Sequence, residues 1–181
     1  MCMVTHLTAQ QDGTGEAAKP VVDSRDVTTV APVAVAVVLE IAETWLGWDG
    51  RPIYRDGNAW TPHKALRRVG DHLLDHLAEI ECRLADQPTV PDHWHGRMVT
   101  LNSDFAHFTE LDLDESTSRL TRLAACYQAR LVGLDADVLD ARPASDVWTI
   151  REVVHHVGHV TEYAEMIGLL PAGTATNPWE I

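Results

Sequence analysis

Two stretches of this chain share one plan, Trp60-Thr-Pro-His-Lys-Ala-Leu-Arg-Arg-Val-Gly70 and Trp148-Thr-Ile-Arg-Glu-Val-Val-His-His-Val-Gly158. They agree at Trp, Thr, Val and Gly in register, and in each the threonine can cap a helix that starts at the following residue. Apolar residues then recur at three or four positions, which is the period of one helix face. The chain is therefore predicted to contain two related helical hairpins.

The same signals, helix caps and apolar periodicity, predict four helices over the whole sequence. Their expected ranges are about 32–46, 61–84, 114–134 and 149–170. Pro32 suits a first helical position, Asp114 or Ser116 can cap the third helix, and Thr149 with Glu152 forms a capping box for the fourth. No segment alternates as a strand would. The predicted fold class is all-α, a four-helix bundle built from two helical hairpins.

The segments outside these helices divide the chain into one domain and two ends. Residues 1–27 show no helical or strand period and are expected to form a flexible N-terminal leader. The bundle should occupy 28–171 and contain an irregular linker at 85–114, where two prolines interrupt the pattern. Residues 172–181 are expected to be a peripheral tail.

The composition narrows the class of protein. A formal net charge of -13 argues against nucleic acid or an anionic membrane as a partner, since both require clustered cations. The apolar stretch 30–41 is too short to span a bilayer and is expected to be a buried helix. Three widely spaced cysteines without a CxxC support neither a disulfide framework nor a thiolate zinc site. We expect a cytoplasmic protein that acts on a small molecule.

Spacing sorts the ten histidines by the helix face on which they fall. On the second helix His72 and His76, at i and i+4, lie roughly 105° and 65° from the centre of the apolar stripe, on one side of it. On the fourth helix His156 lies roughly 75° from the stripe, whereas His159 and His155 lie about 135° and 175° away. His72, His76 and His156 can therefore meet inside the bundle, and His155 is expected to face solvent. The pair His155 and His159 is the second choice.

Three neutral imidazoles with one open position are typical of a catalytic zinc site. Zinc is the expected ion, with nickel, iron or manganese as other divalent candidates. A histidine beside an apolar stripe is also often a hydrogen-bonded boundary residue, so this alternative stays open.

The same residues resemble a known family. The stretch that begins at Trp148 resembles the helix of DinB/YfiT-like proteins that opens Trp-Ser/Thr-x-x-Glu and carries a metal-binding histidine eight residues after the Trp, here His156. The helix that begins at Trp60 resembles the family's last helix, whose HxxxH pair falls on His72 and His76. In the family the single-histidine helix comes first, so the resemblance implies two hairpins exchanged in chain order, a possible circular permutation.

The resemblance implies a metal-dependent transferase or isomerase that uses a low-molecular-weight thiol, as in mycothiol-dependent maleylpyruvate isomerase and bacillithiol transferases. A bound metal would lower the pKa of a thiol or a water toward neutrality. The residues considered for a supporting or pocket role beside the ligands are Asp71, Asp75, Glu152, His159 and Tyr163.

Several other side chains were weighed for the site. The linker residues His93, Trp94, His95 and His107 are candidates for a lid or a fourth ligand. Trp60 and Trp148 are expected to pack at the helix starts.

Two further functions remain open from the sequence. One is a metal-dependent hydrolase, in which water and not a thiol is the nucleophile. The other is a non-catalytic helical protein that binds metal for stability or binds none, with a homodimer as the candidate assembly.

Overall fold

The computed structural model describes residues 25–171, so the first 24 residues of the expected leader and the expected tail 172–181 lie outside the described residues. Helix dominates the described part, as the sequence predicts. The α-helices are α1 (Val27–Glu43), α2 (Pro62–Leu84), α3 (Glu110–Leu131), α4 (Ala136–Asp140), α5 (Ile150–Val157) and α6 (Thr161–Glu165). Three short 3₁₀ segments are η1 (Thr44–Gly47), η2 (Asn102–Phe105) and η3 (Gly158–Val160), and two strands are β1 (Ile53–Arg55) and β2 (Asn58–Trp60).

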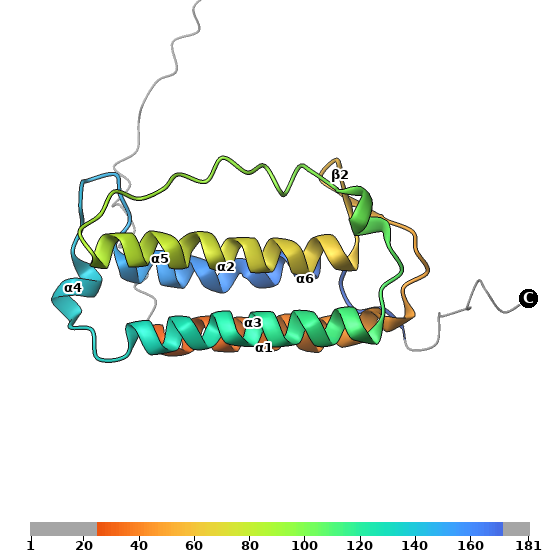
Figure 1. Ribbon diagram of the computed structural model, residues 1–181, viewed down its shortest axis with the longest axis horizontal. Helices are drawn as coiled ribbons and strands as arrows, with labels where there is room; N and C mark the ends of the chain where they lie inside the picture. Colours follow the sequence, from red (N-terminus) through yellow and green to blue (C-terminus); the bar gives the residue numbers. More distant parts are fainter. Residues whose placement is uncertain (1–24, 172–181) are drawn as a thin grey trace, which may run out of the picture.

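The long helices lie side by side, with α1 next to α3 and α2 next to the segment formed by α5, η3 and α6 (Figure 1). In the view of Figure 1, α1 and α5–α6 run in one direction, and α2 and α3 run in the opposite direction. The two middle helices of the sequence are parallel because the segment after α2 carries the chain back along the whole length of that helix.

This packing corrects the expected pairing of helices into hairpins. α1 contacts α3, α5 and α6, and α2 contacts the same three helices. The two helices of each expected hairpin, α1 with α2 and α3 with α5–α6, therefore lie across a diagonal and are not close neighbours. The connections explain the difference: β1 and β2 lie between α1 and α2, and α4 lies between α3 and α5. Connections of this length can cross the end of the molecule, whereas antiparallel neighbours need only a short loop.

Two helix starts also differ from the prediction. α1 begins five residues before Pro32, at Val27, because the side chain of Asp26 accepts a hydrogen bond from the Thr28 amide at 3.0 Å. α3 begins at Glu110 because Thr109 and Asp112 form a reciprocal capping box. Both caps are visible in the sequence. The prediction placed each start later, at Pro32 for the first helix and after Asp114 or Ser116 for the third.

The expectation that no strand forms is wrong for one short hairpin. Ile53 pairs with Trp60 and Arg55 with Asn58 across the turn at Asp56 and Gly57. These two turn residues have φ of 49° and 74°, as the tight two-residue turns of hairpins require. The Asp-Gly pair was the signal for this hairpin, and it was missed because the flanking strands are only three residues long.

The fourth expected helix is correct at its start and interrupted afterwards. The predicted capping box is present: the Glu152 amide donates to Thr149 Oγ1 at 3.1 Å, and the Thr149 amide donates to Glu152 Oε2 at 2.7 Å. The α-helical hydrogen bonding then gives way to η3 after Val157 and resumes in α6. The helix ends at Glu165, five residues before the predicted end near Leu170. Beyond it, Gly168 adopts a φ of 73°, as glycines after a helix often do.

The core is formed by the inward faces of α1, α2, α3 and α5–α6. The stretch Val27–Gly47 is long and apolar enough to cross a membrane on length and composition alone, a test that core helices of soluble proteins also pass. Here Val30, Val35 and Val38 are buried against the other helices. The sequence expectation of a buried helix over 30–41 therefore holds for one face only, since Val33 and Val37 on the helix are exposed.

Candidate metal centre

Three histidines from two neighbouring helices converge at mid-length of the helical array. His72 and His76 are one turn apart on α2, and His156 lies on the last turn of α5. The ring centroids of His72 and His76 are 4.7 Å apart, those of His72 and His156 4.8 Å, and those of His76 and His156 5.1 Å. The facing argument from the sequence selected these three, and the structure brings them together.

The nitrogen atoms of this cluster are spaced so that one ion could hold all three. One ring nitrogen from each of His72, His76 and His156 lies within 4.8 Å of the others. Zinc binds imidazole nitrogen at about 2.0–2.1 Å, which puts tetrahedral ligands about 3.4 Å apart, so a small inward rotation of the rings completes the geometry. The buried Nε2 of His72 has no hydrogen-bond partner among the described residues, and such an atom is costly unless something binds it. The residues present therefore fit a divalent ion.

Both histidines of α2 are held through the opposite ring nitrogen. His76 Nδ1 lies 3.0 Å from Glu79 Oε2, and His72 Nδ1 lies 3.2 Å from the Tyr163 hydroxyl. An ionised carboxylate only accepts, so His76 Nδ1 carries the proton and Nε2 keeps its lone pair for a ligand role. A partner on the far nitrogen of each ring is typical of metal-binding histidines.

Tyr163 is itself held by two contacts to its ring. Trp60 stacks on it at a centroid distance of 6.0 Å, and the Arg68 guanidinium lies 5.4 Å from the ring centroid. Lys64 sits over the other aromatic partner, Trp60, at 4.7 Å. The sequence analysis named Tyr163 as a pocket residue, and its hydroxyl contacts a candidate ligand in the structure.

Burial disfavours the charged form of two of the three histidines, His72 and His156. Burial, together with neighbouring His76 and His156, lowers the pKa of His72 from 6.5 to about 3. The pKa of His156 is also lowered, chiefly by burial and then by His76 and His159. Neutral imidazoles are the form that binds a metal, so these two side chains are available as ligands at neutral pH without first losing a proton.

The carboxylates considered from the sequence lie elsewhere. Asp71 is 3.3 Å from Arg68 Nη1 and 3.7 Å from Arg67 Nη1, and Glu152 closes the α5 capping box and pairs with Arg142 at 2.6 Å. Neither contacts a candidate ligand. Asp75 has a raised pKa, mainly through burial and then through Asp92 and Asp71, and it lines a pocket beside His76.

Glu79 was missed in the sequence analysis, although its position offered a signal. It follows His76 by three residues on the same helix, the spacing at which side chains meet. His159, the other named candidate, is exposed and lies 3.4 Å from Glu162, with its ring 5.6 Å from that of His156. Its side chain therefore lies at the edge of the cluster.

Other expectations about neighbouring residues need correction. His155 was expected to face solvent, but it is only partly exposed and both of its ring nitrogens are buried. Trp148 was expected to pack as a helix-start residue like Trp60, but 48% of its surface is exposed and its ring meets the ring of His156 at 4.9 Å. Among residues 25–171, no histidine of the 85–114 linker belongs to the cluster.

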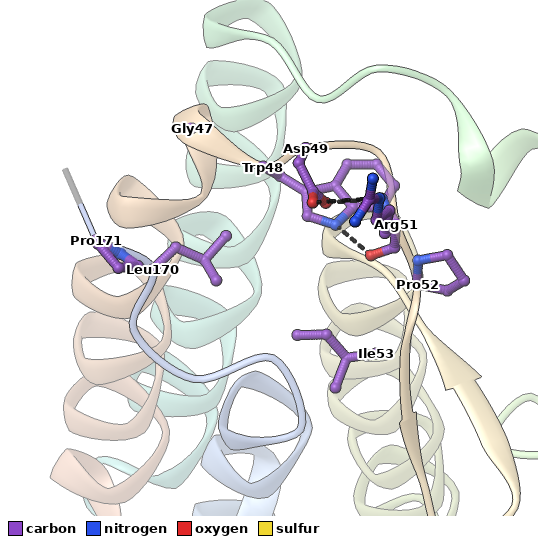
Figure 2. Close-up of a pocket in the computed structure, with 8 residues that line it drawn as sticks. All are labelled: Gly47, Trp48, Asp49, Arg51, Pro52, Ile53, Leu170 and Pro171. Carbon is purple, nitrogen blue, oxygen red and sulfur yellow. Dashed lines mark hydrogen bonds and ion pairs between the residues drawn. The ribbon is translucent and has the colours of Figure 1, made fainter. Parts of the chain in front are cut away.

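One of the pockets of the described residues adjoins the candidate centre, and a second lies elsewhere. The first, of about 510 Å³, is lined by His76 and Glu79 on α2 and by residues 89–94 of the linker. The other, of about 310 Å³, lies near the end of the described chain, between the loop after α1 and Leu170 (Figure 2). In that pocket the Trp48 indole donates to the Arg51 carbonyl oxygen at 2.8 Å, and no histidine or cysteine lines it. Of these two pockets, only the first is therefore lined by a candidate metal ligand.

The resemblance to DinB/YfiT-like proteins rests on the two quoted stretches and on the three histidines within and after them. These histidines are the residues that the structure gathers at one point. No protein-family model, curated protein or solved structure matches this chain.

Proposed function

We propose that this chain is a metal-dependent enzyme in which His72, His76 and His156 hold one divalent ion, Zn²⁺ by first choice. The observation that carries the proposal is the meeting of three imidazoles from two helices, with nitrogens within 4.8 Å and a buried His72 Nε2 that has no hydrogen-bond partner among the described residues. Three protein ligands leave a position for an external molecule, which is the arrangement of catalytic and not of structural zinc sites.

The protein's own groups have separate tasks in this proposal. Glu79 accepts the Nδ1 proton of His76 and so presents Nε2 to the ion, and Tyr163 orients His72 from the other side. Burial keeps His72 unprotonated. When bound, the ion supplies Lewis acidity that lowers the pKa of a coordinated thiol or water.

The reaction class that we propose is thiol-dependent transfer or isomerisation, with a low-molecular-weight thiol such as mycothiol as co-substrate. The support is the resemblance of the two quoted stretches to DinB/YfiT-like proteins and the coincidence of their ligand positions with the observed cluster. We also propose that the side-by-side packing of α1, α2, α3 and α5–α6 is a four-helix bundle of that type with an exchanged chain order.

Metal content is the first test. The purified chain, prepared without chelator, should carry about one first-row metal ion. His156→Ala should weaken zinc binding by more than about 100-fold, because a three-ligand site loses a third of its protein donors. His159→Ala is the matched control, since it removes an exposed histidine from the adjoining 3₁₀ turn, and it should bind zinc like the wild type. Equal effects of the two variants, or no metal in the wild type, would contradict the proposal.

The reaction class needs a second measurement. The zinc-loaded chain should accelerate conjugation of mycothiol to an electrophile such as 1-chloro-2,4-dinitrobenzene, and His156→Ala should abolish the acceleration. Zinc-dependent hydrolysis of an activated ester without any thiol would instead identify a hydrolase. A chain that binds zinc and catalyses neither reaction would favour the non-catalytic alternative.

A further inference from the structure

The segment 85–101, which we call the strap, runs along the length of α2 (Figure 1). Its residues 89–94 line a pocket together with His76 of the candidate centre. The strap is fixed at its start by the Gln87 amide, which donates to the Cys82 carbonyl oxygen at 2.8 Å. At its end Lys64 Nζ, fully buried, donates to Thr100 Oγ1 at 2.9 Å, and Arg67 donates to the Val99 carbonyl oxygen at 3.3 Å. The strap is therefore attached to α2 at both ends.

Between these attachments the strap stands away from α2 along part of its length. At Gly96 it is in close contact: an added Cβ there would lie 2.6 Å from Arg68 Nη1 and would also clash with the Trp94 indole nitrogen. Closer to the start of the strap, residues 89–94 form one wall of the pocket of about 510 Å³ whose other wall is α2. Ligand pockets are commonly about 300–1,000 Å³, so this volume suits a small molecule.

The pocket is joined to the candidate centre by a shared residue. His76 lines it, and so does Glu79, which fixes the ring of His76. Val90, Pro91 and Trp94 give the strap side an apolar surface. A molecule in this pocket would lie with an apolar body under the strap and one end at His76.

The pocket is lined by three carboxylates, Asp75, Glu79 and Asp92, and by two histidines, His76 and His93. Of its carboxylates, Glu79 is already paired with His76 and with Arg83 at 3.3 Å. Asp75 on α2 and Asp92 on the strap form no ion pair among residues 25–171, and the only hydrogen bond to either is from the Trp94 amide to Asp92 at 2.7 Å. The nearby Arg68 is committed to Asp71 and to the face of Tyr163. The pocket therefore presents two carboxylates that form no ion pair among the described residues, beside an apolar wall. Arg68 and His76 act on Asp75 only through longer-range attraction.

We propose that the pocket beneath the strap is the substrate site of the metal centre and that it selects a small amine with an apolar or aromatic body. The ammonium group would lie between Asp75 and Asp92, and the apolar body would pack on Val90 and Trp94. The claim that this pocket is a substrate site rests on the proposed function. The claim that it binds amines depends only on the residues that line the pocket.

A matched set of probes tests the selectivity. Binding of 2-phenylethylamine, 2-phenylethanol and phenylacetate to the zinc-loaded full chain would be followed by calorimetry and by NMR shifts. The amine should bind about fivefold more tightly than the alcohol and the carboxylate should bind most weakly, since each exposed charge pair is worth at most about 1 kcal/mol. Asp92→Asn should reduce the preference for the amine to about twofold or less.

Asp86→Asn is the control variant, because it removes the same charge from the strap outside the pocket, and asparagine tolerates the φ of 53° at this position. It should keep the full preference for the amine. Preferred binding of phenylacetate, no binding of any probe, or equal effects of the two variants would overturn the pocket proposal. Zinc titration of the same samples separates the two claims: zinc binding without amine binding refutes the pocket alone, and amine binding without zinc refutes only the metal centre.

Discussion

The two stretches that share one sequence plan, one at the start of α2 and one at the start of α5, differ most at their tryptophans. Trp60 ends a strand, is fully buried and stacks on Tyr163. Trp148 precedes α5 without a strand, remains 48% exposed and touches the ring of His156. Their threonines behave alike, since each accepts a hydrogen bond from the amide three residues later. A local cap thus follows from local sequence, whereas the position of a large side chain depends on what packs around it.

The candidate ligands differ in the same way between the two regions. The histidines of α2 have their Nδ1 atoms held by Glu79 and Tyr163. The side chain of His156 on α5 makes no hydrogen bond among the described residues and is positioned by ring contacts with Trp148 and its neighbours. We conclude that the α2 side of the centre is preset by polar contacts and that the α5 side is set by packing.

Replacement of the two tryptophans should give the largest difference in stability between the two stretches. Trp60→Ala should lower the free energy of unfolding by about 3–5 kcal/mol, because it removes a fully buried ring. Trp148→Ala should lower it by less than about 1 kcal/mol and should weaken zinc binding only a few-fold by loosening His156. Denaturant unfolding of the metal-free protein and zinc titration measure these effects. Similar losses of stability in both variants would show that the exposure of Trp148 is misjudged.

Removal of the polar support on α2 should have the next largest effect. Glu79→Gln keeps the size of the side chain but weakens its hold on His76 Nδ1, and zinc affinity should fall about 10- to 100-fold. Glu162→Gln, which alters the carboxylate beside His159, is the control and should leave zinc affinity within about twofold. Competition with a chromogenic chelator would measure both. An unchanged affinity in Glu79→Gln would remove its proposed role.

The pH dependence of stability should distinguish His72 from an ordinary histidine. Its pKa is 6.5 in the unfolded chain and about 3 in the folded protein, so the unfolded state binds the extra proton as pH falls. The stability of the metal-free protein should be complete above pH 6.5 and should fall by about 1–2 kcal/mol between pH 7 and pH 5 through this residue. In His72→Gln this contribution disappears, so the curve should be flatter. Parallel curves for the two proteins would contradict the burial of His72.

The caps should show the smallest and most equal effects. Thr61→Ala and Thr149→Ala should each cost about 1 kcal/mol, because each removes one side-chain acceptor from a helix start. Thermal unfolding of the two variants would measure the difference. If the loss of stability in one variant is several times that in the other, the two stretches are alike in sequence but not in the energetics of their caps.

Much of the candidate centre was accessible from spacing. The i and i+4 positions of His72 and His76, and the position of His156 beside an apolar stripe, were enough to select all three. Glu79 was accessible in principle, since it lies three residues after His76 on the same helix. Tyr163 could be named as a pocket residue, but its bond to His72 joins residues 91 positions apart and depends on how α2 and α6 pack.

The sequence by itself determined the helical class, the caps at Thr61 and Thr149 and the face on which each candidate ligand lies. These features depend on hydrogen bonds and periodicity within about four residues, which any local reading contains. Only the tertiary structure decided that the helices of each expected hairpin lie across a diagonal, that Trp60 is buried while Trp148 is not, and that the strap leaves a pocket beside His76. Those outcomes depend on side-chain packing between elements far apart in the chain, where many arrangements satisfy the same local pattern.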